Sequence, residues 1–239
     1  MNQGLTLSSL LGQTFAELRE NGRLVGIFLA IMVPINAFNG WIGEGGPSSA
    51  LGFNAGFNIT EKMLAMGAGV VIIYIVAFLI SIVLIYWLYA ALMARDPSPG
   101  FGRFWPWLGI YLLAILGIGL GILLLIVPGI ILIVRWSLAL PLVIEGKLPA
   151  MDTFGESWEK TSGHSWSIFG AAVILAISIF IVSAVLGGFT GLLSGFSSIP
   201  IIVASAIADS VASAIFIGLA IAIYRLSSDP AEEMMEVFE

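Results

Sequence analysis

Residues 104–144 read FWPWLGIYLLAILGIGLGILLLIVPGIILIVRWSLALPLVI, a run of 41 positions in which Arg135 is the one charged residue. A helix rises about 1.5 Å per residue, so roughly 20 apolar residues cross a hydrocarbon core of about 30 Å. The run is therefore too long for one crossing and predicts two helices with a break between them. We place that helix break at Pro128 and Gly129, because proline lacks a backbone donor and glycine tolerates a turn.

Three other parts of the chain are equally poor in charge. Residues 24–43 and 63–94 contain no charged residue, and residues 165–224 contain one, Asp209. The last of these needs a second break, which the glycine-rich stretch 187–200 supplies. We thus predict an all-α polytopic membrane helix bundle, with six transmembrane helices near 24–42, 63–90, 107–127, 130–146, 165–186 and 199–224.

The overall composition agrees with a membrane protein. Hydrophobic residues make up 59% of the 239 residues, charged residues 10%, and the mean hydropathy is +1.06. Soluble domains are about 45–50% apolar and about 25% charged. The absence of cysteine excludes disulfides and thiolate metal sites, and a net charge of -6 argues against a nucleic-acid surface.

The first 23 residues predict an amphipathic helix. Its apolar stripe consists of Leu7, Leu10, Leu11, Phe15 and Leu18, and its charged residues lie off that stripe. Thr6 or Ser8 is the expected cap. We expect residues 1–23 to lie at the membrane interface, although a soluble N-terminal turn remains an alternative. Residues 24–225 then form the six-helix membrane domain, and 226–239 an acidic cytoplasmic tail.

Basic residues in the short loops predict the orientation of the chain. With the N-terminus in the cytoplasm, seven basic residues lie on the inner side and only Lys62 lies outside. The seven are Arg19, Arg23, Arg95, Arg103, Lys147, Lys160 and Arg225. Six crossings then place both termini in the cytoplasm.

Two charges fall inside the predicted crossings. Arg135 follows Gly129 by six residues and Asp209 follows Pro200 by nine, so their predicted depths differ by only about 5 Å. An isolated charge near the bilayer centre costs at least about 2.5–3.5 kcal/mol. We predict an intramembrane ion pair between Arg135 and Asp209, acting as a structural clamp or in a transport pathway. In the alternative, Arg135 reaches outward to a lipid phosphate.

The sequence offers little for catalysis. The single histidine, His164, stands near Asp152 and Glu156, which are four residues apart and could share a helix face. We interpret these acids as a solvated face rather than as metal ligands. We expect no enzyme activity, no catalytic residues, no metal and no cofactor.

The centre of the chain carries a resemblance to known proteins. Its residues are 126–145, Ala150, the stretch Glu156–Trp166, and Phe169 with Gly170. Together they resemble a broad group of uncharacterised six-helix bacterial inner-membrane proteins. They also resemble the membrane domain sometimes fused to glycerophosphodiester phosphodiesterases. The resemblance implies a bacterial inner-membrane location and a membrane domain without catalysis of its own, and we expect no attached phosphodiesterase domain.

Tryptophans mark the edges of this region. We expect Trp136, Trp158 and Trp166 to be interfacial anchors, because indole rings favour the headgroup level. Trp136 is also expected to stack on Arg135 or to anchor it near the outer interface.

These observations favour a non-enzymatic integral membrane protein, a scaffold or accessory subunit that acts through lipid and protein contacts. The alternative is a small transporter or channel for a lipid or other amphiphile that uses the Arg135 and Asp209 pair. The expected partners are membrane lipids, with a protein partner or a homo-oligomer left open and nucleic acid excluded.

Overall fold

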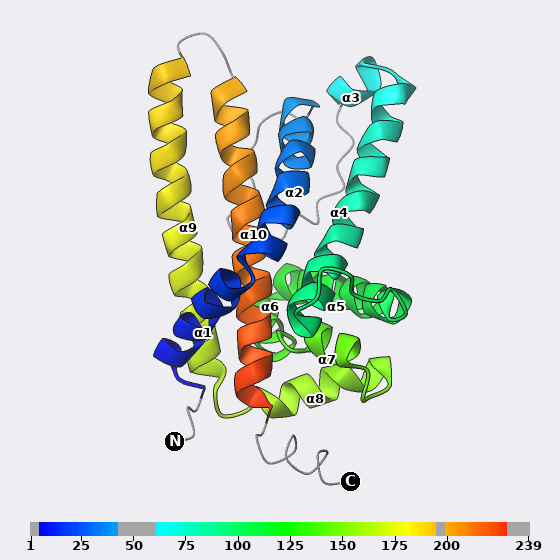
Figure 1. Cartoon of the computed structure of the whole chain (residues 1–239), viewed down its shortest axis with the longest axis vertical. Coiled ribbons are helices and arrows are strands. Elements are labelled where there is room, and N and C mark those ends of the chain that lie inside the picture. Colours follow the sequence, from blue (N-terminus) through cyan, green and yellow to red (C-terminus); the bar gives the residue numbers. More distant parts are fainter. Residues whose placement is uncertain (1–4, 43–60, 195–198, 229–239) are drawn as a thin grey trace. The chain divides into compact units, whose positions relative to one another are not determined.

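The computed structural model describes residues 5–42, 61–194 and 199–228 (Figure 1). Within these ranges the chain forms helices and connecting turns, with no strand. The elements are α1 (Leu7–Glu20), α2 (Gly22–Ile42), α3 (Glu61–Ala65), α4 (Ala68–Ala94), α5 (Phe104–Leu124), α6 (Ile126–Arg135), α7 (Ala139–Glu145), the 3₁₀ turn η1 (Ala150–Asp152), α8 (Thr153–Lys160), α9 (Ser165–Ser194) and α10 (Ile199–Ser227).

Six segments of the described chain are long and apolar enough to cross a membrane. They are α2, α4, α5, the segment Ile126–Glu145 that comprises α6 and α7, the stretch Ser165–Thr190 of α9, and α10. Each is at least 20 residues long and predominantly apolar, which suffices to span the hydrocarbon core. The prediction of an all-α polytopic membrane protein is confirmed.

The break between the third and fourth segments lies earlier than predicted. It falls at Leu125, whose extended backbone (φ -158°, ψ 134°) separates α5 from α6. Pro128 instead lies in the first turn of α6 and Gly129 lies inside that helix. The first four N–H groups of a helix have no partner within it, so a proline is tolerated in that turn. The predicted position at Pro128 and Gly129 was therefore wrong by three residues.

Other helix boundaries also differ from the prediction. The predicted helix 130–146 is interrupted at residues 136–138, ahead of Pro141, and the predicted helix 63–90 is interrupted at Gly67, which has φ +99°. In contrast, α9 continues through Gly187 and Gly188 to Ser194. Residues 195–198 of the second predicted break lie outside the described residues.

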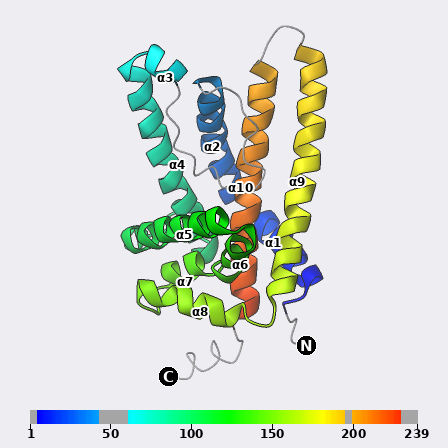
Figure 2. The ribbon, with the colours of Figure 1, turned by 180° about the vertical axis from the view of Figure 1, so that it is seen from behind.

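The chain divides into two compact units. The first comprises residues 1–20, 89–172 and 217–239, and the second comprises 21–88 and 173–216. The first unit thus contains α1, α5, α6, α7 and α8 together with the final turns of α4 and α10 and the first turns of α9 (Figure 2).

In the first unit, α5 and α6 form a helical hairpin held by close glycine contacts. A Cβ atom added at Gly121 would lie 3.0 Å from the Cα of Gly129, and one at Gly117 would overlap the ring of Trp136. Small residues at such spacing let helix backbones approach closely. The Gly117-x-x-x-Gly121 pattern therefore lines an internal contact.

We expect Gly129→Ala to destabilise this hairpin by about 1–3 kcal/mol, the usual cost of overpacking. The added methyl would collide with the side chain of Ile122 and would lie 2.8 Å from its backbone nitrogen, which cannot move without bending α5. Thermal unfolding in detergent measures the effect. Gly109→Ala is the matched control, because a Cβ there meets nothing within 4 Å. Equal unfolding temperatures for the two variants would contradict the close contact.

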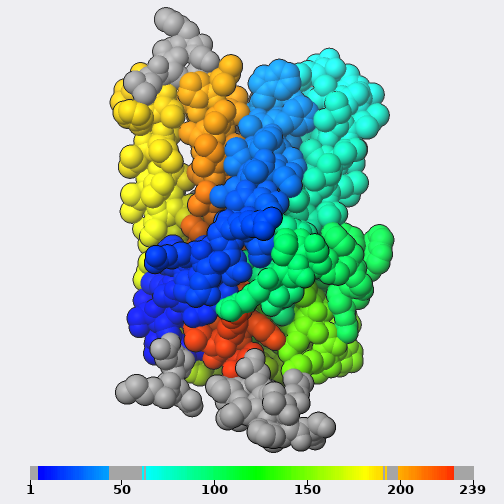
Figure 3. Space-filling view, in the orientation of Figure 1, coloured from blue at the N-terminus to red at the C-terminus, as the bar shows by residue number. Residues whose placement is uncertain are grey.

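Helix α1 also belongs to the first unit and packs against it. Thr6 and Ser9 cap its start reciprocally: the backbone N–H of Ser9 donates to Oγ1 of Thr6 at 3.3 Å, and that of Thr6 donates to Oγ of Ser9 at 3.0 Å. Leu18 contacts Gly218 in α10, and Figure 3 shows α1 lying against the final turns of that helix. A helix in the N-terminal segment is confirmed, and it rests on protein along one face. Its placement at the membrane interface stays a prediction.

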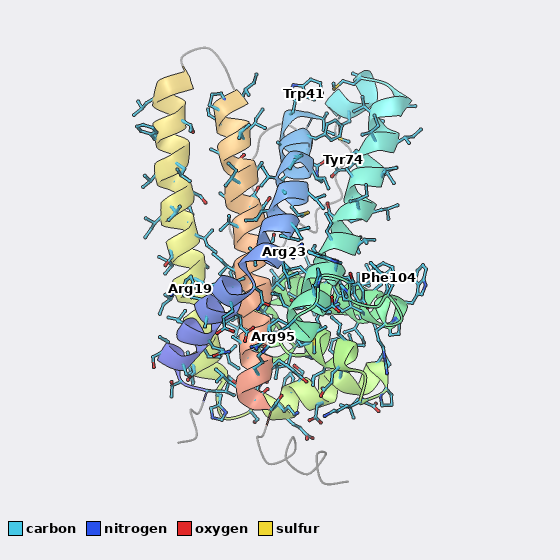
Figure 4. The ribbon with its side chains drawn as sticks, viewed as in Figure 1. Arg19, Arg23, Trp41, Tyr74, Arg95 and Phe104 are labelled. Atoms are coloured by element: carbon cyan, nitrogen blue, oxygen red, sulfur yellow. The ribbon has the colours of Figure 1, made fainter. Side chains whose placement is uncertain are left out.

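In the second unit, α2, α3 and α4 share a small core. Ile42, Met63 and Tyr74 are buried together at one end of these helices; Figure 4 labels Tyr74 on α4. Helix α2 also contacts α10, because the Nδ2 atom of Asn36 donates to Oγ of Ser210 at 3.0 Å, with both side chains buried. This bond joins residues 174 positions apart in the sequence.

The asparagines of α2 provide an internal comparison. The Oδ1 atom of Asn39 is buried and has no hydrogen-bond partner in the structure, whereas Asn36 is bonded to Ser210. We expect Asn36→Leu to cost about 0.6–2 kcal/mol, the range for interhelical hydrogen bonds in membranes. Asn39→Leu should be neutral or stabilising, because it removes an unsatisfied polar atom. The same loss of stability in both variants, measured by thermal unfolding, would contradict the Asn36–Ser210 bond.

Candidate functional site

A buried carboxylate organises one end of the first unit. Glu17, in the last turn of α1, has a side chain that is 0% exposed. Its Oε1 atom accepts from Nε2 of Gln13 at 2.8 Å and lies 3.1 Å from Nε of Arg225 and 3.6 Å from Nη2 of Arg95. We call Gln13, Glu17, Arg95 and Arg225 the Glu17 centre. It joins α1 to the final turns of α4 and α10.

The two arginines of the Glu17 centre are bound to different extents. Arg225 also donates from Nη2 to the carbonyl oxygen of Leu92 at 2.9 Å, so it satisfies a carbonyl in the last turn of α4. Arg95, labelled in Figure 4, has a side chain that is 53% exposed and also pairs with Glu20 at 3.5 Å. Arg225 is therefore the tighter partner of Glu17.

Arg95 has an unusual backbone. Its φ of +53° is in the left-handed region, and the N–H of Asp96 donates to the carbonyl oxygen of Ala91 at 3.2 Å. A left-handed residue with such a hydrogen bond ends many helices, and that residue is usually a glycine. The turn directs the arginine that follows α4 toward α1.

A second polar group surrounds Arg135 at the end of α6. Its Nη1 atom donates to the carbonyl oxygen of Trp158 at 3.2 Å, and its guanidinium carbon lies 5.0 Å from the centre of the Trp158 ring. Ser157 donates from Oγ to the carbonyl oxygen of Arg135 at 2.6 Å and accepts from the N–H of Leu138 at 3.2 Å. We call Arg135, Ser157 and Trp158 the Arg135 centre.

The Arg135 centre explains the interruption at residues 136–138. There the N–H of Ala139 donates to the carbonyl of Trp136 instead of that of Arg135. The hydroxyl of Ser157 donates to the carbonyl of Arg135 and accepts from the N–H of Leu138, so both groups have a partner. Thr153 and Ser157 in α8 and Thr161, which caps its C-terminal end, are spaced four apart and are all 0% exposed, so they form one buried face. The hydroxyl stripe of α8 thus packs inward.

The predicted anchors have different environments. The ring of Trp136 lies 4.6 Å from that of Phe154, centre to centre, and contacts Gly117, so Trp136 packs within the first unit. The expectation that Trp136 stacks on Arg135 was wrong, because the ring beside the guanidinium belongs to Trp158. Trp158 and Trp166 are 43% and 85% exposed, and their role as interfacial anchors stays a prediction.

The predicted ion pair concerns both units. Arg135 lies in the first unit and Asp209 in the second. Asp209 is partly buried, and its backbone carbonyl accepts from the hydroxyl of Ser213 at 2.9 Å. The pairing of Arg135 with Asp209 stays a prediction.

Sequence reasoning missed the two central residues, Glu17 and Ser157. Both residues belong to a pattern of helical spacing that the sequence contains. Leu10, Thr14 and Glu17 recur at this spacing and form the buried face of α1. The buried hydroxyl residues of the α8 segment recur in the same way. Both faces were overlooked because polar residues at helical spacing normally indicate a solvated surface.

The remaining acids of the described ranges show no arrangement for metal binding. Across residues 5–42, 61–194 and 199–228, no three side chains of histidine, aspartate or glutamate come close enough to hold a metal ion. Glu156 instead pairs with Lys160 at 3.3 Å, one helical turn away.

In the second unit, an apolar groove of about 280 Å³ lies between the end of α2 and the start of α10, lined by Ala37, Phe38, Trp41, Ile199, Ile202 and Val203.

Comparisons of the chain with protein families, with curated proteins and with solved structures found no match.

Proposed function

We propose that this protein is a non-enzymatic scaffold or accessory subunit of the bacterial inner membrane, with both termini in the cytoplasm. It acts through contacts with lipids and with a protein partner or a second copy of itself. The observation that carries the proposal is how the arginines of the first unit are used. Arg225 and Arg135 bind a buried carboxylate and backbone carbonyls, and so hold helices together.

The apolar surface supports the same proposal. The tip of the α5–α6 hairpin, residues 123–127, is apolar throughout, and each of its five side chains is at least 66% exposed. Large exposed apolar surfaces indicate contact with lipid or with another protein. A rigid hairpin with such a tip suits a protein that works by contact.

Flux measurements test the proposal. Purified protein is reconstituted in liposomes, and the movement of a fluorescent lipid between leaflets and of a small amphiphile across the bilayer is compared with that in protein-free liposomes. We expect equal rates. A rate several-fold above the protein-free value that falls in both Arg135→Gln and Asp209→Asn would contradict the scaffold and support the transporter.

Crosslinking tests the contact surface. A photoreactive residue at Leu124, which is 77% exposed, should give a discrete adduct with lipid or with one protein in intact membranes. The matched control is Trp107, which lies on the same hairpin but is 0% exposed and should give no intermolecular adduct. Absence of any adduct at Leu124 would remove the support that the hairpin gives.

A further inference from the structure

The Arg135 centre holds a cation whose hydrogen-bonding capacity is mostly unused within its own unit. Among the described residues of the first unit, Trp158 supplies the only acceptor for the guanidinium. A guanidinium has five N–H donors in a planar fork, so four remain. The Trp158 ring covers one side of the group at 5.0 Å and leaves the donors at its edge.

The charge of Arg135 is also not neutralised within the first unit. No described carboxylate of that unit forms an ion pair with it: Glu17 pairs with Arg225 and Arg95, Glu145 with Lys147, and Glu156 with Lys160. Attraction to an indole ring and one carbonyl bond lower the cost of a cation in an apolar setting but leave its charge in place. The site therefore favours an anion.

The surroundings of Arg135 indicate which anion. The five residues before it, Ile130–Val134, are apolar and belong to a segment that is long enough to cross a membrane. Trp158 is partly exposed, and tryptophan favours the level of the lipid headgroups. At that level the abundant anion is the lipid phosphate, and its oxygens match the guanidinium fork.

We propose that Arg135, with its guanidinium on Trp158, binds the phosphate of an anionic lipid headgroup. This inference rests on the proposed function, since it names a lipid contact through which the scaffold acts. Ser157 holds the arginine backbone, and Trp158 orients the side chain, so the site is formed before the lipid arrives. The proposal replaces the predicted partner Asp209 with a lipid.

Lipid binding to the whole chain tests the proposal. Detergent-solubilised protein is titrated with phosphatidylglycerol or phosphatidylcholine, and bound lipid is counted by native mass spectrometry. We expect a preference of about tenfold for phosphatidylglycerol, consistent with hydrogen bonds to a charged group. Arg135→Gln should lose the preference, and Trp158→Leu, which keeps the backbone carbonyl, should weaken it severalfold.

Control variants separate the site from net charge and from misfolding. Arg19→Gln removes the same charge from an exposed position on α1 and should keep the preference. Arg135→Lys keeps the charge but not the planar fork, so it should retain only part of the preference even if Arg135→Gln fails to fold.

Three outcomes would overturn the proposal. In the first, Arg135→Gln folds and keeps the preference for phosphatidylglycerol. In the second, millimolar inorganic phosphate removes the bound lipid, which makes free phosphate the ligand. In the third, the unmodified protein shows no preference and Asp209→Asn creates one, which makes Asp209 the partner of Arg135. None of these outcomes changes the flux or crosslinking result. The scaffold proposal and the lipid-site proposal can therefore be contradicted independently of each other.

Discussion

Arg225→Met is expected to destabilise the protein by about 3–5 kcal/mol, the largest effect of any single change considered. The variant keeps most of the aliphatic length of the side chain but removes its charge. It leaves the carboxylate of Glu17 fully buried without its shorter ion pair, and the guanidinium of Arg95 lies farther away, at 3.6 Å. Removal of one partner from a buried ion pair typically has this cost, because the other charge stays out of water. It also frees the carbonyl of Leu92.

Thermal unfolding in a mild detergent measures this effect, and Arg95→Met is the matched control. Arg95 binds the same carboxylate, but its side chain is half-exposed and its ion-pair distances are longer, so its loss should cost about 0–1 kcal/mol. Arg225→Lys keeps the charge but cannot bind Glu17 and Leu92 in the same geometry, and it should fall between the two. If Arg225→Met and Arg95→Met unfold at the same temperature, the ion pairs of the Glu17 centre do not stabilise the packing of α1.

Ser157→Ala is the second large effect, at about 2–4 kcal/mol. The hydroxyl of Ser157 accepts from the N–H of Leu138 and donates to the carbonyl of Arg135, and the variant removes both hydrogen bonds. A buried polar backbone group without a partner costs about 1–3 kcal/mol, and water is scarce in a membrane protein interior. We expect α6 and α7 to lose their fixed geometry relative to α8.

The control for Ser157→Ala is Ser178→Ala. Ser178 donates to the carbonyl of Ile174 in its own helix, where the backbone already forms regular bonds, so its loss should change stability by less than about 0.5 kcal/mol. Equal unfolding temperatures for the two variants would show that α8 does not support the interruption at residues 136–138.

The fold class could be predicted from the sequence because length and hydropathy alone decide which segments can cross a membrane. The positions of the breaks could not. Pro128 indicated a helix end, yet a proline fits the first turn of a helix as well as a break, and the choice depends on the packing of Gly129 against α5. Likewise, Gly187 and Gly188 lie inside α9 without interrupting it.

The candidate site was predictable only in part. Arg135 and Trp158 stood out, since one is a charge in an apolar run and the other a tryptophan in the short segment that follows that run. Their contact depends on how α8 packs against the end of α6, and neither spacing nor hydropathy contains that information. Glu17 was missed for a related reason: a carboxylate on an amphipathic helix normally faces water, and only Arg225, 208 positions later, makes its burial favourable.

Single-cysteine labelling tests the central claim, a multi-pass membrane protein with both ends in the cytoplasm, most directly. The chain contains no cysteine, so each introduced thiol is the sole target. A membrane-impermeant thiol reagent added to intact spheroplasts should modify Glu61→Cys and Ile199→Cys. Ser98→Cys and Ser162→Cys should react only after the membrane is opened. Modification of Ser98→Cys or Ser162→Cys in intact spheroplasts, or protection of Glu61→Cys and Ile199→Cys, would contradict the account.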